Sequence, residues 1–244
     1  MSEIFVVGCG KSLKDFDFNF LKDKEWVGLC LAFREWERTG IYPTHYVCVD
    51  SVVIKNNIDA IMNLIKNKKC SNFILCKSVL EYCPDIKEYC HKKDSPVIFL
   101  QDLKYSEFNP FQYLIDYCSG SVAVLWAYLQ QKNTINLIGL DCKYVEFIPE
   151  CVKLNDGTLK IVQEVKDNPN YYFADYQRPG DIYNVPNVNS VHKRSWFHIR
   201  NICILYNILT HKEICIYNYN DVDTLKDWFE TKPLNSLPNY DSHN

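Results

Sequence analysis

The residues best suited to chemistry stand near the start of the chain, where an apolar run ends in two glycines that are one residue apart. Glycine lets the backbone approach an anion closely and adopt a positive φ without a side-chain clash. Free N–H groups in such a turn, with a helix start behind them, favour negative charge. We therefore predict a nucleotide or diphosphate site at the carboxyl end of the first strand, where open α/β sheets bind their ligands. The residues of this turn are Gly8, Cys9, Gly10, Lys11 and Ser12.

The same turn also fits an ordinary strand end with two convenient glycines. Leu13 stands where the dinucleotide-binding pattern G-x-G-x-x-G needs its third glycine, and the spacing is not that of a Walker A loop. The turn alone leaves both interpretations open.

A second candidate anion site stands at the start of a helix predicted over residues 119–129. Hydroxyl groups and unpaired N–H groups converge at such a helix start. The residues that follow, 122–129, are almost wholly apolar, so we expect the helix to be buried on most faces. Helix capping by serine or glycine is the simpler interpretation. The residues of this second site are Ser119, Gly120 and Ser121.

Asp50 follows a predicted strand at residues 45–49. An acidic residue just past a strand end is well placed to contact a ribose or an acceptor hydroxyl. It suits equally well the N-cap of a following helix.

Strand and helix patterns alternate along most of the chain. Apolar runs predict strands at 4–7, 26–31, 45–49, 73–76, 97–100, 135–138 and 213–218. Helices are expected at 33–38, 57–67, 78–91 with a division at Pro84, 119–129, 192–210 and 223–229. Such alternation predicts an α/β fold, namely a single Rossmann-like, mainly parallel sheet with helices on both faces.

Residues 145–190 interrupt this alternation, since they are rich in Asn, Asp, Pro and Tyr and contain no long periodic segment. One short hairpin is expected there, with Gly157 in its turn. The segment is too apolar and aromatic for disorder, so we predict an irregular lid-like insertion that covers the carboxyl edge of the sheet; a structural Ω loop is the alternative. The polar loop at 101–112 is a further candidate lid. We expect one domain over 1–232 and a tail at 233–244.

Composition excludes several classes of protein. A formal net charge of -3 over 244 residues argues against a general nucleic-acid binder. No apolar run approaches the roughly 18 residues that cross a bilayer, and the chain starts directly with a strand, so we expect neither a transmembrane segment nor a signal peptide. The 12 cysteines form no C-x-x-C pair, which favours reduced, largely buried thiols and a cytoplasmic location. Cys83 and Cys90 with His91 would be a weak metal cluster.

Several short motifs together resemble a known group of enzymes. Residues 7–13 resemble the G-x-G-P-S-L start of the small bacterial sialyltransferases, of the motility accessory factors that glycosylate flagellin, and of the MptE-like pterin diphosphokinases. Residues 119–122 and 139–141 resemble their (T/S)-S-G-x helix start and their G-x-D strand end. Residues 168–176 resemble the N-H-F-x-x-D-Y stretch of the accessory factors. His192 falls where the sialyltransferases carry their catalytic base.

This resemblance implies a glycosyltransferase that moves a sugar, such as a CMP-linked sialic-acid-like sugar, from a nucleotide to a hydroxyl of a glycan or protein acceptor. It implies His192 as general base, because neutral imidazole can accept a proton near pH 7, with His198 as the rival base. Arg194 and Tyr176 would offset the charge of the leaving phosphate. The glycine turn would hold phosphate and the helix start at 119–121 the nucleotide or donor carboxylate. Further donor contacts are expected from Asp50, Gly139 and Asp141.

The chain departs from the resembled pattern at two places. Lys11 replaces the usual proline and could add a charge-assisted bond to phosphate. Leu31 and Ala32 stand near the position of an asparagine that contacts the donor in the sialyltransferases, which leaves the identity of the donor open.

Two other mechanisms stay open. No D-x-D metal motif stands at a strand end. Residues 221–223 have the letters but follow the last strand, where helix capping explains them better, so we predict transfer without a metal or other cofactor. A diphosphokinase on the same scaffold would instead need Mg²⁺ and converging carboxylates from Asp50, Asp141 and Asp175. A non-catalytic nucleotide-binding module is the third hypothesis. A homo-oligomer is compatible with all three.

Overall fold

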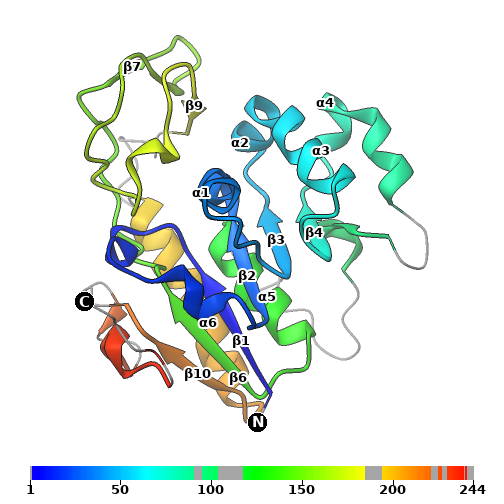
Figure 1. Cartoon of the computed structure of the whole chain (residues 1–244), viewed down its shortest axis with the longest axis vertical. Helices are drawn as coiled ribbons and strands as arrows, with labels where there is room; N and C mark the ends of the chain where they lie inside the picture. Colours follow the sequence, from blue (N-terminus) through cyan, green and yellow to red (C-terminus); the bar gives the residue numbers. More distant parts are fainter. Residues whose placement is uncertain are drawn as a thin grey trace.

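Seven short strands form one parallel sheet in a computed structural model that describes residues 2–90, 95–103, 118–184, 194–220, 225–226, 230–238 and 240. Their spatial order is β10-β6-β1-β2-β3-β4-β5, and every neighbouring pair is parallel (Figure 1). The strands are β1 (Glu3–Val7), β2 (Trp26–Leu29), β3 (His45–Cys48), β4 (Asn72–Leu75), β5 (Val97–Phe99), β6 (Thr134–Ile138) and β10 (Cys215–Asn218). The predicted α/β class and parallel sheet are confirmed.

Apolar side chains cover both faces of this sheet. Along β1, Phe5 and Val7 belong to one buried cluster, whereas Ile4 and Val6 belong to another. Successive residues of a strand point to opposite faces, so each face needs its own apolar cover. The helices supply it, as the prediction of helices on both faces required.

Six α-helices lie among the described residues, together with several short 3₁₀ helices. They are α1 (Phe33–Thr39), α2 (Ser51–Asn56), α3 (Ile58–Lys66), α4 (Val79–Tyr82), α5 (Ser119–Leu129) and α6 (Arg194–Thr210). Helices α1 and α3 pack on the face that carries Phe5, and α5 and α6 pack on the opposite face. The predicted helix at 78–91 is divided at Pro84, as expected. Most of the predicted helix at 223–229 and of the loop at 101–112 lies outside the described residues.

The insertion contains a small sheet of its own. Strands β7 (Cys151–Lys153), β8 (Leu159–Ile161) and β9 (Ile182–Tyr183) pair in antiparallel fashion. Gly157, at φ +86°, lies in the turn between β7 and β8, which confirms the predicted hairpin. In Figure 1 this unit lies beyond the carboxyl ends of the strands of the main sheet. Its own buried side chains are Ile148, Leu159, Ile161, Val165 and Tyr183.

The described residues include no helix with the length and apolar character needed to cross a bilayer. All twelve cysteines are free thiols, but only four of them are buried and Cys215 is exposed, so the expectation that they are largely buried is wrong.

Candidate functional site

The turn after β1 lies tightly against the turn after β6. A Cβ atom on Gly8 would lie 2.1 Å from the carbonyl oxygen of Gly139, and one on Gly10 would lie 2.3 Å from the carboxyl carbon of Asp141. Neither contact is possible between real atoms, so both positions need glycine. Gly8 therefore serves the close approach of two backbone turns, and Gly10 the close approach of the Asp141 carboxylate, where the sequence had predicted a bound anion.

The N–H groups of the glycine turn are largely used within the molecule. Gly8 N–H donates to the carbonyl of Ile138 and Gly10 N–H to that of Gly139, both at 2.8 Å. Ser12 N–H donates to a carboxylate oxygen of Asp141 at 2.9 Å, and the Ser12 hydroxyl donates to the other oxygen. The amides of Gly8, Gly10 and Ser12 are thus not free for an anion, contrary to the expectation. The reason is the pairing of β1 with β6, which brings the Asp141 carboxylate to the start of the 3₁₀ helix η1 (Lys11–Leu13).

A residue just past a third strand, β10, also contacts the turn after β6. Gly139 adopts φ +66°, and a Cβ there would lie 2.3 Å from Leu13. The N–H of Leu140 donates to the side-chain oxygen of the fully buried Asn220 at 3.0 Å. Sequence reasoning missed Asn220, although it stands just past the last strand, as Asp50 stands just past the third.

The start of α5 joins the same edge of the sheet. The Ser119 hydroxyl oxygen accepts from the N–H of Val49 and from the thiol of Cys30, both at 3.2 Å. Ser119 thereby contacts the chain just past β3 and β2. A Cβ on Gly120 would come within 3.3 Å of Leu140, so α5 begins directly beside the turn after β6.

The start of α5 is capped, although the N-cap is Cys118 and not a serine or glycine. Ser121 is fully buried; its hydroxyl accepts from the N–H of Cys118 at 3.3 Å, and its own N–H donates to the Cys118 thiol at 3.4 Å. This reciprocal pair is a capping box. The Ser121 side chain is therefore committed to the helix and is not available to a ligand.

Asp50 is a helix N-cap. One of its carboxylate oxygens accepts from the N–H groups of Val52 and Val53, at 2.9 and 3.2 Å, which starts α2. The same carboxylate accepts from the side-chain amide of Asn184, at the end of the described insertion, at 3.0 Å. Asp50 therefore joins the sheet edge to the insertion.

Lys11 also contacts the insertion. Its ammonium lies 3.0 Å from the carboxylate of Asp167, and the two side chains are 39% and 76% exposed. Lys11 lowers the pKa of Asp167 through a hydrogen bond and its charge. An exposed pair of this kind contributes little to stability, so Lys11 can exchange this partner for another anion.

Tyr171 and Tyr176 cover the glycine turn. Tyr171 forms an isolated antiparallel bridge with Gly10, and the N–H of Tyr172 donates to the carbonyl of Cys9 at 3.2 Å. The rings of Tyr171 and Tyr176 stack with centroids 3.6 Å apart. The predicted ordered insertion over the carboxyl edge is present here.

The Tyr176 hydroxyl and the Cys9 thiol stay protonated. Burial, with a smaller contribution from Cys9, raises the pKa of Tyr176 well above its usual range. Burial also raises the pKa of the Cys9 thiol, and the nearby Cys30 thiol raises it further. The Tyr176 hydroxyl therefore keeps its proton at neutral pH, with the Cys9 thiol as its side-chain hydrogen-bond partner, and Cys9 is a poor nucleophile.

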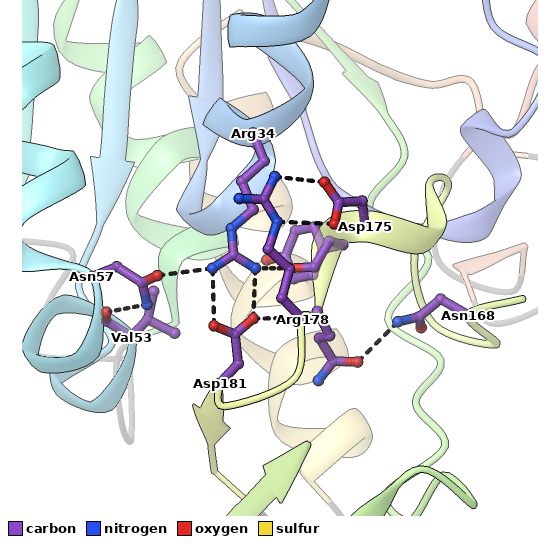
Figure 2. A network of polar contacts seen from close by, with 9 residues as sticks. Arg34, Val53, Asn57, Asn168, Asp175, Arg178 and Asp181 are labelled. Atoms are coloured by element: carbon purple, nitrogen blue, oxygen red, sulfur yellow. Dashed lines mark hydrogen bonds and ion pairs between the residues drawn. The ribbon is translucent and has the colours of Figure 1, made fainter. Parts of the chain in front are cut away.

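Arg34 links the insertion to α1 and α3, and sequence reasoning did not single it out. Figure 2 shows its guanidinium between Asp181 and Asn57. It bonds both carboxylate oxygens of Asp181, at 2.5 and 2.9 Å, the carbonyl of Tyr176 at 2.8 Å, and the side-chain oxygen of Asn57 at 3.0 Å. The only sequence signal was a charged residue directly after the short apolar segment at 31–33.

The predicted base and one predicted cation are not placed. His192 lies outside the described residues, as does the side chain of Arg194 at the start of α6. His198 lies within α6 and is half-buried.

The carboxylates of the diphosphokinase hypothesis are not assembled. Asp175 forms an ion pair with Arg178 at 2.5 Å, and Asp50 and Asp141 cap helices. Within the part of the chain that the structure describes, no three His, Cys, Asp or Glu side chains form a group able to hold a metal ion.

Comparisons with known proteins identify the fold. No protein-family model and no curated protein matches the chain. Its structure is similar to that of the sialyltransferase CstII from Campylobacter jejuni in complex with cytidine-5′-monophosphate, with a TM-score of 0.55 and 14% identity over 98% of this chain and 88% of that chain. A CstII variant with CMP gives a TM-score of 0.52 and 14% identity over 99% and 93%.

A third solved structure is matched over only part of its length. The MAf glycosyltransferase from Magnetospirillum magneticum AMB-1 aligns with 97% of this chain and 34% of that chain, at 14% identity and a TM-score of 0.49. The two CstII structures show that the chain shares the fold of that sialyltransferase. The resemblance to the MptE-like enzymes stays a prediction from the sequence motifs.

Proposed function

We propose that the chain is a glycosyltransferase that uses a nucleotide-activated sugar. The observation that carries this proposal is one of placement. The turns after β1 and β6, the start of α5 and the Tyr171–Tyr176 stack meet at the carboxyl end of the parallel sheet. Open α/β sheets bind ligands at that end, and the fold resembles that of an enzyme solved with CMP over 98% of this chain.

The internal bonds of the glycine turn change the expected roles of its residues. Because Gly8, Gly10 and Ser12 use their N–H groups internally, we assign phosphate contact chiefly to the start of α5 and to the protonated hydroxyl of Tyr176, which would exchange its bond to the Cys9 thiol for one to phosphate. Lys11 would add positive charge after releasing Asp167. The glycines and Asp141 would then shape the floor of the site without bonding the donor.

The chemistry requires one proton transfer and one departing phosphate. The acceptor hydroxyl of a glycan or protein would lose its proton to the imidazole of His192 while its oxygen bonds the sugar carbon. The bond from that carbon to the nucleotide phosphate would break, and Tyr176 and Arg194 would stabilise the charge on the phosphate. We propose a CMP-linked, sialic-acid-like donor, no metal requirement, and a cytoplasmic setting.

A nucleotide panel tests the donor class. Purified protein is heated with CMP, UDP, GDP or ATP, each with and without Mg²⁺. A nucleotide at about 100 times its Kd should stabilise the native state by about 2.7 kcal/mol, which raises Tm by roughly 5–10 °C for a chain of this size. Stabilisation by CMP without Mg²⁺ supports the proposal, whereas stabilisation by Mg-ATP alone contradicts it and favours a phosphotransferase.

The proposed base is tested by His192→Gln in a transfer assay with a CMP-linked sugar. Loss of a general base should lower kcat by about 10²- to 10⁴-fold and leave CMP-induced stabilisation intact. His198→Gln is the matched control and should keep kcat near that of the parent. If His198→Gln loses activity and His192→Gln does not, the base is misassigned. Nucleotide binding without turnover in the parent protein would point to a binding module.

A further inference from the structure

Arg34 is a buried cation whose guanidinium donates four hydrogen bonds within the described part of the molecule. Its side chain is 7% exposed and that of its partner Asp181 is 15% exposed. The guanidinium bonds three separate segments, because Asp181 and Tyr176 belong to the insertion and Asn57 directly precedes α3. Figure 2 shows the amide of Asn57 to the left of the guanidinium and the carboxylate of Asp181 below it.

One of these bonds fixes a residue of the proposed site. The carbonyl of Tyr176 accepts from Arg34 at 2.8 Å, and the Tyr176 ring lies stacked on Tyr171, whose backbone bridges to Gly10. Arg34 of α1 thus holds the backbone of Tyr176. The Tyr176 ring is held by Tyr171, which in turn pairs with the glycine turn.

Two other side-chain contacts between the insertion and the sheet edge are weaker in kind. Lys11 and Asp167 form an exposed pair, and Asp50 meets Asn184 through a neutral amide. Arg34 instead forms a two-point bond to a carboxylate away from water, which fixes orientation as well as distance. Its donors point into the protein, so it is not placed to bind a phosphate itself.

We propose that Arg34 is a positioning residue that holds Tyr176 where its hydroxyl can donate to the departing phosphate. The inference rests on the proposed transferase function. It assigns to Arg34 an effect on the reaction that acts through Tyr176 and not through contact with the donor.

The test is a double-mutant cycle of Arg34→Lys and Tyr176→Phe. Lysine keeps the charge but is a point donor, so it cannot bond Asp181 at two points and also reach Tyr176 and Asn57. We expect Arg34→Lys to lower kcat by about tenfold or more and to change the donor KM by less than about threefold, since the lost interaction belongs to the transition state. In the Tyr176→Phe background the same change should lower kcat by less than about twofold.

Arg178→Lys is the matched control. Arg178 lies in the same insertion and forms an exposed ion pair with Asp175, so its conservative replacement should leave kcat and KM unchanged. If Arg34→Lys lowers kcat equally in both backgrounds, or leaves kcat at the parent value, the positioning role is wrong.

Hydrogen exchange separates this proposal from the proposed function. Arg34→Lys should speed exchange of the amides at 171–181 by about tenfold or more while amides of the central strands keep their protection. If the parent protein transfers no sugar, the transferase function fails, and the exchange rates alone decide whether Arg34 holds Tyr176. Unchanged exchange at 171–181, or equal acceleration throughout the sheet, would overturn the proposal.

Discussion

The Asp141 carboxylate does within the molecule what a bound anion was expected to do. It accepts from the N–H and hydroxyl of Ser12 and lies against Gly10. The sequence features of an anion-binding turn, two glycines and a serine before a helical turn, are therefore equally those of a turn capped by the chain itself. A negative charge already in place makes this turn a poor direct ligand for phosphate.

Gly8 yields the sharpest prediction at the scale of single residues. In Gly8→Ala the new methyl group would meet the Gly139 carbonyl, which is backbone and cannot rotate away. We expect a loss of about 2–4 kcal/mol in the free energy of unfolding, measured by denaturant titration.

Gly120→Ala is its control, because the nearest atom to the new methyl group is the flexible end of the Leu140 side chain, and the position is helical. The change in stability should stay within about 1 kcal/mol. Equal losses in the two variants would contradict the close-approach explanation of Gly8.

At the scale of secondary-structure elements, the opposite end of the sheet carries a buried titratable group. His45 starts β3, is 3% exposed, and lies edge-on to Trp126 of α5. One ring nitrogen meets the side-chain amide of Asn72 at 3.0 Å and the other meets the carboxylate of Glu25 at 3.3 Å. The amide donates to the first nitrogen, so a neutral ring that donates to Glu25 satisfies both contacts.

This environment makes stability depend on pH. Burial lowers the pKa of His45, against the opposing effect of Glu25. The unfolded chain therefore binds a proton more readily than the folded protein, and stability falls as pH drops below about 6.5, by at most about 1.4 kcal/mol per pH unit. Unfolding at pH 7 and pH 5 measures the slope.

A variant without the buried titratable group checks the assignment. His45→Gln should remove most of the slope between pH 7 and pH 5, even if its stability at pH 7 is lower. His211→Gln, at an exposed position after α6, should keep the parental slope. A parental slope in His45→Gln would show that another group is responsible.

At the scale of the whole molecule, apolar pattern was enough to predict the sheet and most helices. The runs at 4–7, 45–49 and 135–138 are short, apolar and bounded by turn residues, so local sequence decides their conformation. Helix α2 was missed because its six residues carry no helical period and depend on the Asp50 cap. Strand β2 ends at Leu29, earlier than predicted, because Cys30 turns to φ +48°.

The meeting of the site's turns at one edge of the sheet was predicted, but the contacts of individual atoms were not. Carboxyl ends of parallel strands meet at one edge, so the meeting of the turns after β1 and β6 with the start of α5 followed from the fold class. The partners of individual atoms did not follow, because they join residues more than 100 positions apart. Ser12 meets Asp141, and Arg34 meets Asp181, across such separations.

The position of β1 in the sheet has a consequence for synthesis of the chain. This first strand ends up between β2, which follows it closely, and β6, which begins at Thr134. A nascent chain that has not yet emerged as far as Thr134 exposes an open, apolar strand edge, which is a template for wrong pairing. Ribosome stalling or premature termination before that residue should therefore leave a fragment that depends on chaperones or aggregates, whereas a chain that stops after Ile138 already has the partner that closes this edge.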